Sequence, residues 1–215
     1  MKTPKVPVAK EGYPFIFFAA FTTLILTLIS CSWAAYLGLA ITAFILYFFR
    51  DPERFIADKE HIVVCPADGK IIAIEKIYDD EFLQERAYKI SIFMNIFNVH
   101  VNRVPLSGHI RQILYSPGKF YSADSEQGAL HNEKCATIVE SDSGVKIAFV
   151  QVAGLIARRI INWLEIDDVV TKGERFGLIR FGSRVDIYIP TDIALAVENG
   201  MKVRAGETVI GYLSV

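Results

Sequence analysis

The segment with the clearest chemical potential is the tetrapeptide FGSR at residues 181–184. It lies between two apolar runs, 176–181 and 185–189, which are predicted to be strands. Because glycine has no Cβ, the carbonyl of Gly182 can be held in a strained conformation and approached closely by the hydroxyl of Ser183. Attack by that hydroxyl would turn the peptide bond into an ester, through a tetrahedral intermediate that needs oxyanion stabilisation. A Gly-Ser pair is also a common turn, and that interpretation stays open.

An ester at this position has a further chemical consequence. Loss of the ester by β-elimination would leave dehydroalanine, which tautomerises and hydrolyses to a pyruvoyl group in place of Ser183. Decarboxylation of an amino acid needs an electron sink for the carbanion that remains when CO₂ departs, and no ordinary side chain offers one. A pyruvoyl ketone provides the sink by forming a Schiff base with the substrate amine. The Gly-Ser pair therefore suits an enzyme that makes its own pyruvoyl cofactor for the decarboxylation of an amino acid.

Composition limits the other classes of function. With 215 residues, 23 Lys and Arg against 24 Asp and Glu, and a net charge of -1, the chain fits one medium catalytic domain without an overall attraction to nucleic acid. Cys31, Cys65 and Cys135 lie far apart and lack the spacing of a zinc site. We expect free, buried cysteines, no metal and no nucleic-acid partner.

An uncharged stretch from Tyr13 to Phe49 dominates the N-terminal part of the sequence. Since one membrane span needs about 20 apolar residues, this stretch predicts two helices of roughly 16 residues with a break near residues 30–33. Basic residues precede and follow the stretch, which by the positive-inside rule places both ends, and the catalytic domain, on the cytoplasmic side of the cell membrane. A shallow re-entrant hairpin and a hairpin buried in a soluble core are the alternatives.

After residue 54 the sequence changes to short β-rich runs separated by Gly, Pro and Asp. We therefore expect a membrane-anchoring hairpin at residues 1–54 and a mainly β (α+β), sandwich-like catalytic domain at residues 55–215. Helices are expected only at 154–163 and 192–199. The other strands are expected at 61–65, 70–77, 88–93, 136–140, 146–152 and 209–213.

A weak internal repeat relates residues 170–174 (VTKGE) to residues 203–207 (VRAGE). Each copy reads as a turn that leads into a strand, with the glycine supplying a positive φ. This texture is similar to the pseudo-symmetric sandwich of biotinyl and lipoyl carrier domains. A membrane-tethered carrier or adaptor module, modified on Lys202, is therefore the competing hypothesis.

Taken together, several motifs resemble the phosphatidylserine decarboxylase proenzyme family in its short bacterial and archaeal form. The resemblance spans about residues 45–215. It rests on the order and spacing of RDP at 50–52, PADG at 66–69, NVHVNRVP at 98–105, Gly108, NE at 132–133, Gly154 and FGSR at 181–184.

The resemblance implies self-cleavage into a β chain of residues 1–182 and an α chain of residues 183–215, which stay together as a heterodimer. Ser183 would become the pyruvoyl group, and the enzyme would convert phosphatidylserine into phosphatidylethanolamine. Asp68 and His100 would act as a base system on Ser183, and His100 would later protonate the carbanion. Asp68 as a hairpin-turn residue and His100 as a strand histidine are the structural alternatives.

The sequence departs from longer members of the family at one important place. Those relatives carry two histidines in a Y-H-R-V-H pattern, whereas here Arg103 occupies the position of the second. FGSR likewise replaces their LGST. The resemblance also points to Arg184 as a contact of the substrate phosphate.

Two further groups of polar residues are candidates for binding the substrate or the membrane. His131, Asn132 and Glu133 are candidates for the substrate pocket, although a solvated loop is equally compatible. Arg158 and Arg159, near Trp163, would suit anionic headgroups or a solvated helix surface.

Overall fold

The computed structural model describes residues 7–30, 32–56, 61–122, 125–155, 159–180 and 182–213. The chain forms two compact units, Met1–Glu53 and Arg54–Val215. Each unit has its own secondary structure and is described separately.

The N-terminal unit is a helical hairpin. A 3₁₀ turn, η1 (Lys10–Gly12), leads into α1 (Tyr13–Leu28), and α2 (Ser32–Phe48) returns alongside it. The two helices approach closely at Gly38, where a Cβ would lie 2.6 Å from Thr23 Oγ1, and the hydroxyls of Thr23 and Thr42 are 3.3 Å apart. The predicted pair of short apolar helices is therefore confirmed, with 16 and 17 residues.

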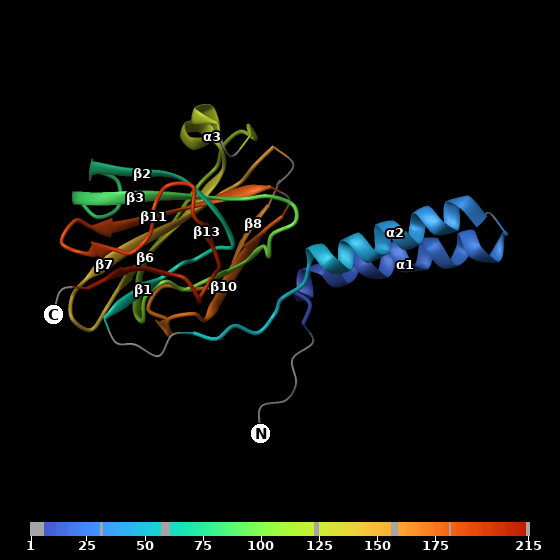
Figure 1. Ribbon diagram of the computed structural model, residues 1–215, viewed down its shortest axis with the longest axis horizontal. Coiled ribbons are helices and arrows are strands. Elements are labelled where there is room, and N and C mark those ends of the chain that lie inside the picture. The colour runs from blue at the N-terminus through green and yellow to red at the C-terminus, as the bar shows by residue number, and fades with distance from the viewer. Residues whose placement is uncertain are drawn as a thin grey trace, which may run out of the picture. The chain divides into compact units, whose positions relative to one another are not determined.

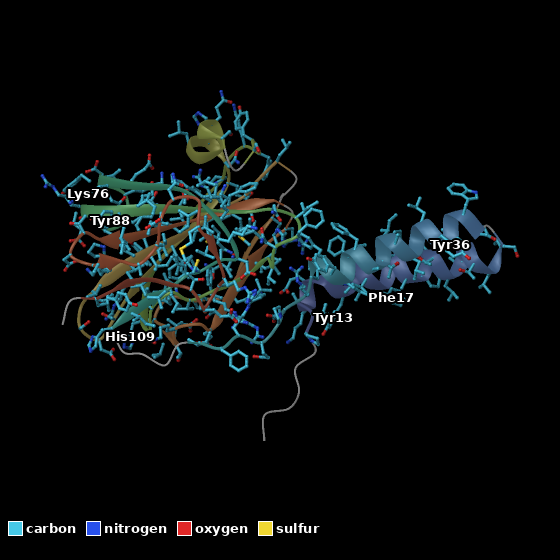
Figure 2. The ribbon with its side chains drawn as sticks, viewed as in Figure 1. Tyr13, Phe17, Tyr36, Lys76, Tyr88 and His109 are labelled. Atoms are coloured by element: carbon cyan, nitrogen blue, oxygen red, sulfur yellow. The ribbon has the colours of Figure 1, made fainter. Side chains whose placement is uncertain are left out.

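The surface of this hairpin is strongly apolar. Figure 2 shows Phe17 and Tyr36 projecting away from the helices, and these side chains are 72% and 75% exposed. The helical segment Lys10–Leu28 is long and apolar enough to cross a membrane, judged by length and composition alone, while α2 falls below that length.

The second unit is mostly β, as predicted. Its strands are β1 (Ile62–Val64), β2 (Gly69–Asp79), β3 (Glu85–Met94), β4 (Val101–Arg103), β5 (Gly108–Ser116), β6 (Lys134–Glu140), β7 (Lys146–Val152), β8 (Ile160–Asn162), β9 (Val169–Val170), β10 (Arg175–Ile179), β11 (Ser183–Pro190), β12 (Ala194–Leu195), β13 (Lys202–Val203) and β14 (Val209–Tyr212). One short helix, α3 (Glu126–His131), lies between β5 and β6.

The strands form one large antiparallel sheet and two small ones. The large sheet has the order β13-β2-β3-β11-β7-β6-β5-β9 and curls into a half-barrel, while the small sheets are β1-β14-β12 and β4-β10-β8. In Figure 1, β11 is seen between β3 and β7. All eight residues of β11 are buried, and its second half, Ile187–Pro190, is apolar apart from the hydroxyl of Tyr188. Phe149 and Phe176 meet edge to face inside the fold, at 4.7 Å between ring centroids.

The internal repeat seen in the sequence is part of a much larger pseudo-symmetry. We call the strands β1, β2, β3, β11, β12, β13 and β14 repeat A, and the strands β4 to β10 repeat B. Taken in chain order, the seven strands of repeat A match the seven of repeat B, so that each repeat supplies one small sheet and half of the large one. Repeat B is thus inserted into repeat A between β3 and β11.

Matching hydrogen bonds support this correspondence. Gly206 N donates to Cys65 O and Gly173 N donates to Val104 O, both at 2.8 Å. The two glycines have φ values of 75° and 82°. A Cβ on either glycine would collide with Ile56, at 2.7 Å and 2.4 Å from its Cδ1, so Ile56 lies against both turns.

Two predicted helices are wrong. Residues 160–162 form β8, which pairs with β10, and residues 194–195 form β12, which pairs with β14. Both segments are short apolar runs, whose local pattern fits a helix or a strand equally well, and a strand partner decided the outcome. Residues 156–158 of the first segment lie outside the described residues. The expected strands agree with the observed ones to within a few residues.

The helix α3 was not predicted. Ser125 caps its N-terminus, and the Ser125 hydroxyl accepts a hydrogen bond of 3.0 Å from the backbone N–H of Gly128. Ser125 followed by Glu126, Gln127 and Gly128 is a cap signal that sequence reasoning overlooked.

Candidate active site

Ser183 is the first residue of β11 and is completely buried. It pairs with Met94, the last residue of β3, and its Oγ donates a hydrogen bond to Met94 Sδ at 3.6 Å. Because a thioether is a weak acceptor, this hydrogen bond orients the hydroxyl but is easily exchanged for a stronger one. The serine is therefore withdrawn from bulk water in an apolar setting.

Gly182 has a φ of 60°, in the left-handed region that favours glycine. It stands where the chain leaves β10 of one small sheet and enters β11 of the large sheet. Among the described residues, chain neighbours aside, no atom lies within 4 Å of the place where a Cβ of residue 182 would be. Phe181, the first residue of the FGSR motif, lies outside the described residues.

Asp68 lies directly before β2 with both carboxylate oxygens engaged. Its Oδ2 accepts a hydrogen bond from Arg54 Nη2 at 2.7 Å, and its Oδ1 accepts one from the backbone N–H of Ala205 at 2.8 Å. The side chains of Arg54 and Asp68 are 8% and 11% exposed. Asp68 is therefore not at the tip of a hairpin turn but in a nearly buried ion pair.

His100 lies directly before β4 and is 2% exposed. Its Nδ1 is 3.0 Å from the carbonyl oxygen of Asn98. Because a carbonyl can only accept a hydrogen bond, Nδ1 carries the proton in the neutral ring, and Nε2 is the basic nitrogen. This tautomer suits a general base.

The strand register places Asp68 and Ser183 at the same end of the large sheet, whereas His100 precedes β4 of a small sheet. Phe93 of β3 pairs with Lys70 of β2 on one side and with Arg184 of β11 on the other. Ser183 directly precedes Arg184 and Asp68 lies two residues before Lys70, so both are at the end where β3 stops. His100 enters through β4, whose first residue pairs with Leu178 in the strand that leads to Ser183. Within the described residues no hydrogen bond joins these three side chains directly.

Two buried amides, one of which shares the Met94 sulfur with Ser183, were missed by sequence reasoning. Asn102 Nδ2 donates to Met94 Sδ at 3.7 Å, and Gln151 Nε2 donates to Asn102 Oδ1 at 2.9 Å. Both residues are 0% exposed. The available signal was a single amide in the otherwise apolar run of β7, because a buried polar side chain needs a partner.

The remaining predicted site residues have structural contacts. Arg184 is buried and forms an ion pair with Asp186 of the same strand at 2.8 Å. Arg103 Nη1 donates to Gly173 O at 2.8 Å, within the repeat turns. These guanidinium groups have partners inside the fold.

The segment 131–133 is divided in its exposure. His131 is exposed at the end of α3, Glu133 is half-buried, and Asn132 is buried. The amide of Asn132 bonds the backbone of Tyr121 through both of its polar atoms and donates to Ala153 O at 2.7 Å. Asn132 thus ties the loop before α3 to the end of β7.

Two cysteines are free and buried, as predicted, and Cys31 lies outside the described residues. Burial raises the pKa of the Cys65 thiol to about 12, and burial also raises the pKa of Cys135. Lys202, the modification site of the carrier hypothesis, lies in β13 and pairs with Lys70. Lys202 therefore does not lie at the tip of a hairpin, where a carrier domain has its modified lysine.

Known proteins match this chain over nearly its whole length. The family model described as phosphatidylserine decarboxylase matches residues 41–211. A protein of Desulfotalea psychrophila is 60% identical over 99% of this chain and 100% of the relative, and one of Syntrophus aciditrophicus is 47% identical over 95% and 96%. A protein of Syntrophotalea carbinolica is 44% identical over 99% and 100%. All three are named phosphatidylserine decarboxylase proenzyme, and the chain belongs to the phosphatidylserine decarboxylase family.

Proposed function

We propose that this protein is a phosphatidylserine decarboxylase that cuts its own chain between Gly182 and Ser183. The observation that carries the proposal is the junction itself, where a glycine with a φ of 60° directly precedes a fully buried serine. The word proenzyme in the names of the relatives supports a processing step. The product would be phosphatidylethanolamine, with release of CO₂.

Self-cleavage begins with proton transfer from Ser183 Oγ to a base, for which His100 Nε2 is the candidate. The Ser183 oxygen turns from Met94 and forms a bond to the carbonyl carbon of Gly182. The C–N bond then breaks as the base returns its proton to the Ser183 nitrogen, which gives an ester and a free amine. Loss of the Ser183 α-proton then expels the carboxylate of Gly182, the new C-terminus of the β chain. Tautomerisation and hydrolysis of the remaining dehydroalanine release ammonia and leave a ketone at residue 183.

The surroundings of residue 183 fit a pyruvoyl group. When formed, this group supplies an electrophilic carbonyl and an electron sink for the departing CO₂. Burial at the start of β11 keeps water away, and the amides of Asn102 and Gln151 provide polar lining next to Met94. His100 Nε2 would return a proton to the substrate carbon.

The two chains are expected to remain assembled after the cut. β11, at the start of the α chain, is hydrogen-bonded along its length between β3 and β7, which belong to the β chain. Removing a central strand would expose two sheet edges and the core. The mature enzyme is therefore a heterodimer of its own fragments.

We further propose that the apolar hairpin of α1 and α2 holds the enzyme on the cell membrane with the catalytic unit on the cytoplasmic side. The long exposed apolar surface and the basic residues on both flanks support this orientation. Such an anchor suits a substrate and a product that both remain in the bilayer.

The intact mass of the purified protein tests the proposal. We expect two fragments, 1–182 and 183–215, the smaller of which has a blocked N-terminus that reacts with a carbonyl reagent. Ser183→Ala should give one uncut chain without activity, whereas Ser143→Ala, in the turn between β6 and β7, should be cut normally. Continued processing and CO₂ release by Ser183→Ala would overturn the proposal, and CO₂ release from free serine but not from the lipid would overturn the substrate.

A further inference from the structure

Arg54 is the first residue of the catalytic unit, and its guanidinium bridges two carboxylates. Nη2 lies 2.7 Å from Asp68 Oδ2, and Nη1 lies 3.6 Å from Glu207 Oε2. The side chain is only 8% exposed. Enclosing an arginine in this way requires removing its charge from water, which is costly unless its partners are well placed.

The pseudo-symmetry reveals what the turn beside Asp68 needs. The residue of repeat B that corresponds to Asp68 is Ser107, whose Oγ accepts a hydrogen bond from the backbone N–H of Lys172 at 2.9 Å. Asp68 Oδ1 makes the matching bond to Ala205 N at 2.8 Å. A neutral hydroxyl therefore satisfies this turn in repeat B, and the fold alone does not require a carboxylate at residue 68.

The second carboxylate oxygen is the feature that repeat B lacks. In repeat A, Asp68 Oδ2 is held by Arg54, and this is the repeat whose sheet ends at Ser183. Arginine suits such a role because its planar donors fix the orientation of a carboxylate. Repeat A therefore has a carboxylate where repeat B has a hydroxyl, and this carboxylate lies at the end of the sheet where the proposed cleavage occurs.

We propose that Arg54 is a positioning residue for self-cleavage, which holds the Asp68 carboxylate in its working orientation. The inference rests on the proposed function, because Asp68 acts only if the chain is cut at Ser183. It places an essential contact in the RDPER segment, directly after the apolar hairpin in the sequence.

The test measures the rate of self-cleavage of the full-length chain after a short pulse of cell-free synthesis with membranes, followed by gel electrophoresis. We expect Arg54→Gln to be cut roughly 10- to 100-fold more slowly, since 1.4 kcal/mol of lost transition-state stabilisation is about tenfold in rate. Arg54→Lys should recover part of the rate, because it restores the charge without the planar fork. Arg204→Gln is the matched control, since Arg204 contacts the same Glu207 at 3.5 Å but is 71% exposed, and it should be cut at the normal rate.

A double-mutant comparison separates positioning from general damage to the fold. If Arg54 acts through Asp68, Arg54→Gln should slow the wild-type chain but should not slow Asp68→Asn further. Equal slowing in both backgrounds, or normal cleavage of Arg54→Gln, would overturn the inference. Thermal unfolding of each uncut chain is measured in parallel, and should Arg54→Gln prove unfolded, Arg54→Lys decides by the same comparison.

Failure of the proposed function gives a different result. A wild-type chain that is never cut overturns both the function and the inference. A wild-type chain that is cut at Ser183 while Arg54→Gln matches it overturns the inference alone.

Discussion

Repeat A and repeat B share seven strands in the same order, but they differ where the third strand meets the fourth. In repeat B, β6 and β7 are joined by the short turn 141–145, which closes a hairpin. In repeat A the corresponding strands, β3 and β11, are joined only through the whole of repeat B. The hairpin has in effect been opened, and its two ends meet at Met94 and Ser183.

The backbone at these two places is nevertheless alike. Gly144 precedes Val145 with a φ of 83°, and Gly182 precedes Ser183 with a φ of 60°. Apart from chain neighbours, the part of the chain that the structure describes has no atom within 4 Å of a Cβ on either glycine. A left-handed glycine before the strand therefore does not by itself distinguish the proposed cleavage site from the turn in repeat B. The difference lies in the serine itself and in the Arg54–Asp68 ion pair, for which repeat B has only the neutral Ser107.

The substitution that tests this comparison most directly places a serine after Gly144 in repeat B. We expect Val145→Ser to leave residues 144–145 uncut while cleavage at residue 183 continues, because repeat B has the neutral Ser107 in place of Asp68 and its ion pair with Arg54. Mass spectrometry of the fragments would reveal either cut. A fragment ending at Gly144 would mean that a Gly-Ser pair with a left-handed glycine is sufficient by itself.

The matched turn glycines test the symmetry of the scaffold. Gly173→Ala and Gly206→Ala should each lower the free energy of unfolding by about 2–4 kcal/mol, from the strain of a left-handed alanine and the collision with Ile56. Denaturant unfolding of the uncut Ser183→Ala protein measures both. A large loss for one variant and none for the other would contradict the equivalence of the repeats.

Substitution of the strand-entry glycines separates stability from chemistry. Gly182→Ala and Gly144→Ala should each cost about 1–2 kcal/mol of stability. Only Gly182→Ala should also slow self-cleavage, by roughly tenfold, because a Cβ restricts the approach to the carbonyl. Equal rates of self-cleavage for the two variants would show that the glycine at residue 182 is not needed for the reaction.

The smallest effect concerns Cys65 and its counterpart Val104. Because burial raises the pKa of Cys65 to about 12, the folded state keeps its proton where the unfolded chain loses it, above about pH 9. The stabilisation is complete below pH 9 and is lost as the pH rises toward 12. Relative to Cys65→Val, the wild type should lose about 1 kcal/mol of unfolding free energy between pH 9 and pH 10. If the free energies of unfolding of wild type and Cys65→Val changed in parallel with pH, the raised pKa of Cys65 would be contradicted.

Sequence reasoning predicted the local features well because they are encoded by neighbouring residues. The absence of charge from Tyr13 to Phe49 was enough to predict two apolar helices, and alternating or continuous apolar runs predicted most strands of the large sheet. The Gly-Ser pair pointed to a chemistry, and its motif context pointed to the family. A short part of both repeats was also recognisable in the sequence, at the two V-x-x-G-E turns.

The environment of the site depended on contacts between distant segments, which no local pattern specifies. Asp68 meets Ala205 across 137 residues, and Ser183 meets Met94 across 89. The same is true of β8 and β12, where a strand partner overruled a helical pattern. The sequence by itself determined which residues can react and which segments are apolar. The tertiary structure alone decided which groups surround the serine, because strand pairing brings together residues that the chain keeps far apart.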